Sequence, residues 1–64
     1  MLKFDVYRRY SNGLLVWIGA VESLQAAYEL VKVQAKHPSD EFAVRTFFTY
    51  NLTHVRADET HESA

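Results

Sequence analysis

The stretch that decides the fold is residues 10–24, which read YSNGLLVWIGAVESL. Asn12-Gly13 between two apolar runs is the strongest short-range signal for a β-hairpin. The run after it, residues 14–21, predicts a strand that is apolar on both faces and is too short to cross a membrane. Ser23 then provides the side-chain oxygen of a helix N-cap. Strand, turn, strand and helix therefore follow one another around this stretch.

The flanking sequence predicts the remaining elements. Leu2, Phe4 and Val6 alternate with polar or aromatic residues, a period of two that predicts a first strand over residues 2–10. Helical spacing begins at Leu24, and we expect the helix over residues 24–37, because the residue before Pro38 disfavours α geometry. Residues 41–52 predict a third strand. Residues 1–55 then form one ββαβ domain, and the polar residues 56–64 form a flexible tail.

The predicted fold class is α+β, with a three-stranded mixed sheet and one helix packed on one face. The helix returns the chain across the sheet, so the third strand runs parallel to the second. It can lie beside the first strand, giving the order 2-1-3, or beside the second. We prefer the order 2-1-3.

The turn type decides which face of the hairpin is buried. A type I′ turn at Asn12-Gly13 pairs Tyr10 with Leu15, whereas a type I turn with Gly13 as a left-handed bulge pairs Tyr10 with Leu14. This difference of one residue moves every side chain of the second strand to the opposite face. We prefer the bulged turn, because it gathers four apolar residues on the core side: Phe4, Val6, Val16 and Ile18.

Composition limits the classes of function. The chain has 64 residues, of which 48% are hydrophobic, a net charge near −1 and no cysteine. A chain of this size is marginally stable alone, and without disulfides it depends on a good core or on association. The absence of cysteine fits a reducing compartment, and we see no signal peptide, so we expect a cytoplasmic protein of bacterial type.

We find no pattern typical of an enzyme, a metal site or a cofactor site. The histidines His37, His54 and His61 are too widely spaced to pair as metal ligands. Each of the three serines has a turn, cap or loop explanation, and we interpret Asp5 as a solvated charge opposite Gly19. We expect no catalytic residue, no metal and no cofactor.

The segment from Trp17 to Ala27 has the pattern W-x-G-x-x-x-S-L-x-x-A. It resembles a recurring segment of short, uncharacterised bacterial ββαβ proteins. Those proteins have a Pro-Gly turn before the third strand, where this chain has Pro38-Ser39-Asp40. The resemblance implies the same order of elements and no activity.

The sheet face away from the helix is the most unusual predicted surface. It combines aromatic and apolar residues with cations: Lys3, Tyr7, Arg9, Leu15, Trp17, Arg45 and Phe47. On the helix, Ala26, Leu30 and Val33 form a second apolar stripe beyond what one small sheet covers. Both surfaces predict a protein-interaction module, most simply a homodimer or a hetero-associating module.

Two other interpretations of the same face stay open. Single-stranded nucleic acid can stack its bases on Tyr7, Trp17 and Phe47 while Lys3, Arg9 and Arg45 meet phosphates. The net charge and the helix stripe favour protein association over this reading. Alternatively, the end of the third strand and the tail fold back over the face.

Overall fold

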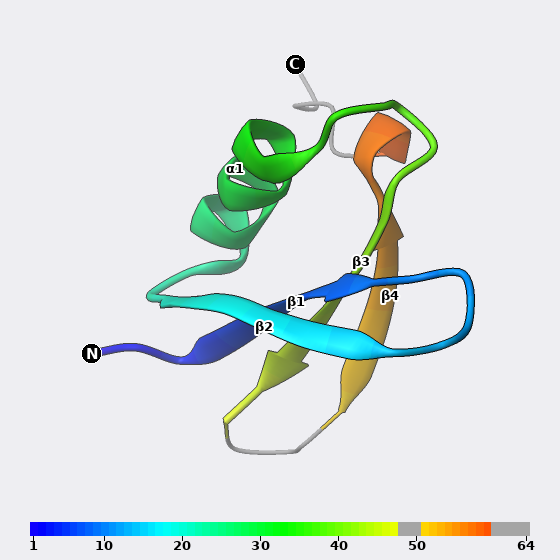
Figure 1. The fold of residues 1–64 in the computed structure, drawn as a ribbon. Coiled ribbons are helices and arrows are strands. Elements are labelled where there is room, and N and C mark those ends of the chain that lie inside the picture. Colours follow the sequence, from blue (N-terminus) through cyan, green and yellow to red (C-terminus); the bar gives the residue numbers. More distant parts are fainter. Residues whose placement is uncertain (48–50, 60–64) are drawn as a thin grey trace.

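The computed structural model describes residues 1–47 and 51–59. The elements are β1 (Phe4–Arg9), β2 (Leu15–Val21), α1 (Leu24–Gln34), β3 (Glu41–Thr46), β4 (Leu52–Arg56) and a 3₁₀ turn, η1 (Ala57–Glu59). In Figure 1, α1 lies on one side of the sheet, and β3 and β4 cross behind the β1–β2 hairpin. The α+β class is confirmed.

The sheet has four strands in the order β2-β1-β3-β4, and every neighbouring pair is antiparallel. The predicted order 2-1-3 is confirmed, as is the parallel direction of β3 and β2. Two parts of the prediction are wrong. The sheet has four strands rather than three, and it is antiparallel rather than mixed, because β1 separates the two parallel strands.

The fourth strand comes from the segment predicted as the end of the third. The predicted strand over residues 41–52 ends at Thr46, and the chain returns as β4 beside β3, with Val44 paired to Thr53. Apolar and β-branched residues continue on both sides of this reversal, so periodicity alone shows one long strand. Residues 48–50, between β3 and β4 in the sequence, lie outside the described residues.

The hairpin contains both of the registers considered from the sequence. Gly13 has φ of +88°, and the Tyr10 N–H donates to the Leu14 carbonyl (2.9 Å), as the bulged turn requires. Tyr7 accordingly pairs with Trp17. A register shift between Val6 and Tyr7 then pairs Val6 with Gly19 rather than with Ile18. Such a bulge in β2 lets Ile18 pack against the core while Trp17 stays on the other face.

The core lies between α1 and the sheet. Its buried members are Val6, Ala27, Val31, Phe42, Val44 and Val55. Val16, a predicted core position, is 41% exposed, and Leu24 at the start of α1 is 45% exposed, so neither belongs to the core. Both lie toward the margins of the helix–sheet contact.

The helix and the predicted tail also differ from expectation at their ends. The helix ends at Gln34, before the predicted stop at residue 37, because Ala35 is already extended (φ −70°, ψ 137°). The predicted flexible tail begins within β4 and continues as η1, where the Ala57 N–H donates to the Asp40 carbonyl (2.8 Å). Residues 60–64 lie outside the described residues. No helix in the described ranges is long and apolar enough to cross a membrane.

Candidate interaction surface

The sheet face away from α1, called the outer face below, is built from alternate residues of all four strands. Cross-strand pairing places these residues on it: Asp5, Tyr7 and Arg9 of β1, Leu15 and Trp17 of β2, Glu41, Ala43 and Arg45 of β3, and Leu52, His54 and Arg56 of β4. The α-helix among the described residues packs on the opposite face. The outer face therefore carries Tyr7 and Trp17 together with most of the ion pairs of the sheet.

Asp5 is the centre of a polar network on the outer face. Its Oδ1 accepts a hydrogen bond from Trp17 Nε1 (3.0 Å), and its Oδ2 pairs with an Nη of Arg45 (3.2 Å). The Arg45 guanidinium also lies over the Tyr7 ring, 5.7 Å from its centroid, in a cation–π contact. Three strands thus contribute side chains to one connected cluster, which holds the Trp17 indole in a defined orientation.

The interpretation of Asp5 as a solvated charge is wrong. Its side chain is 15% exposed and it pairs with Ala20 rather than with Gly19, because the bulge shifts the register. The signal in the sequence was a carboxylate within a predicted strand. In the fold, Trp17 of β2 and Arg45 of β3 lie beside it. Sequence alone does not reveal those partners, since Arg45 is 40 residues away.

The other two arginines on the outer face also have acidic partners. Arg9 forms an ion pair with Glu41 on the neighbouring strand, and Arg56 pairs with Asp58 of η1 (2.6 Å). Glu59 accepts a hydrogen bond from the Arg56 main chain (3.0 Å). Each of the three arginines on the outer face is therefore paired with an acidic side chain, which the sequence alone does not reveal.

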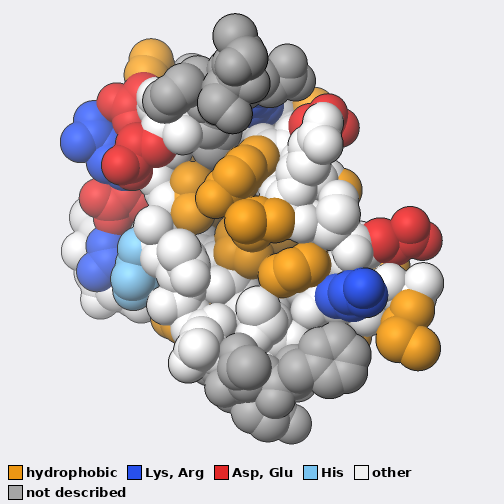
Figure 2. All heavy atoms as spheres, turned by 180° about the vertical axis from the view of Figure 1, so that it is seen from behind, with side chains coloured by type: hydrophobic (Ala, Val, Ile, Leu, Met, Phe, Trp, Pro, Cys, Tyr) orange, Lys and Arg blue, Asp and Glu red, His pale blue; other side chains and the backbone are white. Residues whose placement is uncertain are grey.

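Exposed apolar side chains lie on the outer face beside these paired charges. Trp17 is 58% exposed, Phe47 38% and Leu52 40%, whereas Tyr7 and Leu15 are half-buried. Leu52 pairs with Arg45 across β3 and β4, so it joins the outer face from a strand that was not predicted. Figure 2 shows the molecule from behind relative to Figure 1, with hydrophobic side chains near the middle of the view and charged side chains toward its margins.

The predicted helix stripe separates into a packed part and an exposed part. Leu30 packs against the core, and its Cδ2 lies 3.1 Å from the position that a Cβ would take at Gly19. A glycine at this position therefore allows the close approach of α1 to β2. Val33 is 78% exposed, so it is the part of the stripe that remains accessible.

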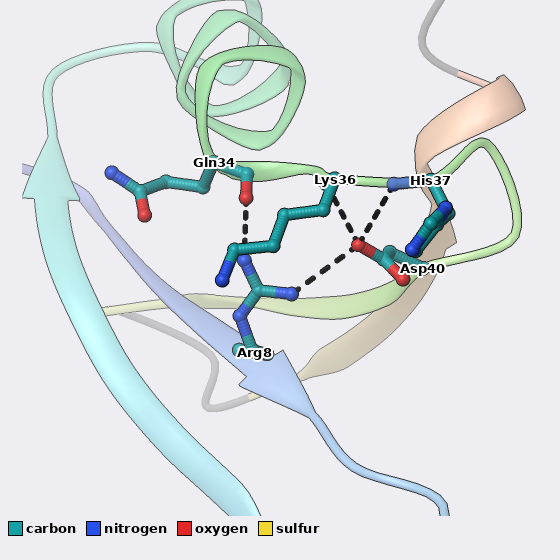
Figure 3. A network of polar contacts seen from close by, with 5 residues as sticks. All are labelled: Arg8, Gln34, Lys36, His37 and Asp40. Carbon is teal, nitrogen blue, oxygen red and sulfur yellow. Dashed lines mark hydrogen bonds and ion pairs between the residues drawn. The ribbon is translucent and has the colours of Figure 1, made fainter.

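A second polar cluster, around Asp40, stabilises the junction of α1, β1 and β3 (Figure 3). The Asp40 carboxylate accepts hydrogen bonds from the main-chain N–H groups of Lys36 (2.8 Å) and His37 (3.2 Å), and Arg8 approaches it at 3.4 Å. Arg8 also donates to the carbonyl of Gln34 at the carboxyl end of α1, where a cation is favoured. These bonds lower the pKa of Asp40, the Lys36 N–H being the largest cause.

One shallow hollow at the β3–β4 end is lined by Arg9, Glu41, His54, Val55, Arg56 and Glu59, and both of its arginines are engaged in ion pairs. Within residues 1–47 and 51–59, no group of three or more histidine or acidic side chains is placed to hold a metal ion. The outer face is therefore our candidate interaction surface.

No family model, curated protein or solved structure matches this chain. The resemblance to short bacterial ββαβ proteins therefore stays a prediction, and the functional argument depends on the surface itself.

Proposed function

We propose that the chain is a small protein-interaction module that binds a protein partner on its outer face, with Trp17 as the anchor. The observation that supports this best is the state of Trp17, which is 58% exposed although its ring nitrogen is hydrogen-bonded to Asp5. The indole is thus fixed in orientation while much of its apolar surface stays in water. We propose no catalytic step for this chain, and we propose a cytoplasmic location because a chain without cysteine suits a reducing compartment.

A fixed, exposed tryptophan suits binding for an energetic reason. Immobilising a side chain at an interface costs about 0.5–1.5 kcal/mol, and this cost is reduced when the side chain is already held. Tryptophan, tyrosine and arginine are also the residues that most often dominate binding energy at protein interfaces. Trp17, Tyr7 and Arg45 combine these three types in one connected cluster.

Structural stabilisation is the simplest competing explanation for the cluster. Cross-strand pairs contribute roughly 0.2–1 kcal/mol each to the stability of a sheet. On this explanation, the bonds from Trp17 and Arg45 to Asp5 stabilise the sheet and have no part in binding. Stabilisation does not require Trp17, Phe47 and Leu52 to stay exposed on the same side, however. The two explanations predict different effects of Trp17→Ala. If the cluster serves binding, the variant loses its partner; if the cluster serves only stability, the variant is less stable but still binds.

Single-stranded nucleic acid is less well supported than a protein partner. Arg9 and Arg45 would have to leave Glu41 and Asp5 to meet phosphates, and the chain has a net charge near −1. Electrostatic attraction supplies most of the affinity of sequence-independent nucleic-acid binding. Salt-sensitive quenching of Trp17 emission by oligonucleotides would favour nucleic acid instead.

Affinity isolation from a lysate with matched variants tests the proposal. Trp17→Ala and Leu52→Lys alter the outer face at β2 and at β4, whereas Val33→Ser alters an exposed position on α1. We expect the wild type and Val33→Ser to retain the same partner protein, and both outer-face variants to lose it by about tenfold or more. Equal retention by all four folded proteins, or no partner with any of them, would contradict the proposal.

A further inference from the structure

We infer that β2 is the pairing edge for a second copy of this chain, so that two sheets join antiparallel into one eight-stranded sheet. This edge consists of main-chain groups of β2, whereas the outer face consists of side chains. In the described part of the chain, β2 has one neighbouring strand, β1, and lies at the end of the sheet. A sheet edge presents main-chain donors and acceptors that a further strand can pair with.

The edge-facing groups of β2 follow from the hairpin geometry. The Tyr10 N–H donates to the Leu14 carbonyl, so Leu14 lies in a hydrogen-bonded pair with β1. Bonded and non-bonded pairs alternate along an antiparallel ladder. The main-chain groups of Leu15 and Trp17, which pair with Arg9 and Tyr7, therefore point away from β1 toward the edge.

The edge lacks the charged side chains that usually prevent pairing. All seven residues of β2, LVWIGAV, are uncharged, and natural edge strands commonly carry lysine or proline against such contacts. The bulge at Ile18 is a protective device of this kind, but it lies beyond the regular segment that contains Leu15 and Trp17. An uncharged strand can pair with its own copy without like-charge repulsion.

The helix beside this edge is also apolar on the matching side. Leu30 packs over Gly19 of β2, and at about 100° per residue Val33 lies about 60° from Leu30 around α1, whereas Lys32 lies about 160° from it. The end of α1 lies above the start of β2, since Arg8 pairs with Val16 and bonds to Gln34. Val16 and Val33 are 41% and 78% exposed at this level.

The spacing of the elements favours a second copy as the occupant. The closest neighbours of α1 in the sheet are β1 and β2, so it lies mainly over this strand pair. Strands lie about 4.8 Å apart, which places two such helices about 10 Å apart across a β2–β2 junction. Packed helices are separated by about 8–10 Å. Edge pairing would thus bring the Leu30–Val33 sides of both helices into contact, and the strand edge and the helix side would be buried together.

Solution mass combined with amide hydrogen exchange tests this inference. We expect a mass that rises from one chain to two with concentration, and slow exchange at the Leu15 and Trp17 amides only in the dimer. Val33→Glu places two like charges near the junction and should weaken association about tenfold or more. Gln25→Glu makes the same charge change on the exposed far side of α1 and should leave association unchanged.

Each result decides the question without depending on the outer face. A monomer at high micromolar concentration would overturn the inference, as would a dimer whose Leu15 and Trp17 amides exchange as fast as in the monomer. Leu52→Lys changes β4 and leaves the β2 edge intact. If the proposed function fails, Leu52→Lys keeps the partner protein; if edge pairing fails, the chain stays a monomer.

Discussion

Asp5 shows how one side chain links stability to a binding surface. Replacing it with alanine removes an acceptor used by both Trp17 and Arg45. Loss of a largely buried, charge-assisted acceptor costs about 1–3 kcal/mol. We expect Asp5→Ala to lower the free energy of unfolding by this amount in urea titrations, and to shift the emission of Trp17 because its ring nitrogen loses its partner.

An exposed carboxylate provides the control for this prediction. Glu29→Ala on α1 changes the net charge equally and should change stability by no more than about 0.5 kcal/mol. If Asp5→Ala unfolds at the same urea concentration as the wild type, with unaltered emission, the network neither holds Trp17 nor stabilises the sheet.

At the scale of elements, Asp40 joins the end of α1 to β1 and to the loop before β3. Its pKa in the folded protein lies below the ordinary value of 3.8, mainly because the Lys36 N–H favours the charged form, with His37 and Arg8 adding to the effect and burial opposing it. A lowered pKa stabilises the fold above the unfolded value, and this contribution is lost as the pH falls through the folded value. We expect Asp40→Asn to be less stable than the wild type near pH 7, and the difference to shrink below about pH 4.

Urea midpoints measured from pH 7 to pH 2.5 check this expectation. Glu29→Gln, which removes one carboxylate from the exposed side of α1, corrects for the change in net charge. A constant difference between Asp40→Asn and the wild type over the whole range would show that the charge of Asp40 does not hold this junction.

The sequence predicts elements whose signals are local. Asn12-Gly13 predicts the hairpin, and Ser23 predicts the start of α1, where its hydroxyl accepts the Ala26 N–H (3.1 Å). The end of α1 is not predicted, because it depends on Asp40, which follows the helix and draws the Lys36 and His37 main chain into a turn.

The sequence does not predict features that depend on residues far apart in the chain. The hairpin register changes within β2, so neither of the two simple registers describes the whole strand. β4 continues the β character of the preceding strand and is seen as separate only once it pairs with β3. On the surface, the aromatic residues of the outer face are predicted by alternation, but the pairing of Arg9 and Arg45 with Glu41 and Asp5 is not.

At the scale of the whole molecule, one helix covers one face of a four-stranded sheet. The accessible surface of 4524 Å² includes exposed apolar side chains on the outer face, at the β2 edge and on the adjacent side of α1. An interface of standard size uses about 800 Å² from each partner, close to a fifth of this surface. Two interfaces of this size, one on the outer face and one at the β2 edge, would take more than a third of the surface. A chain of 64 residues can provide both only if many of its apolar side chains are exposed.

Hydroxyl-radical footprinting in a nuclease-treated cell extract tests the central claim, that a protein covers the outer face. Leu24, which is 45% exposed at the start of α1, is an internal control away from that face. We predict that oxidation of Trp17 and Leu52 falls in the extract relative to the purified chain at the same concentration, while oxidation of Leu24 is unchanged. Equal oxidation of Trp17 and Leu52 in both solutions would contradict the account.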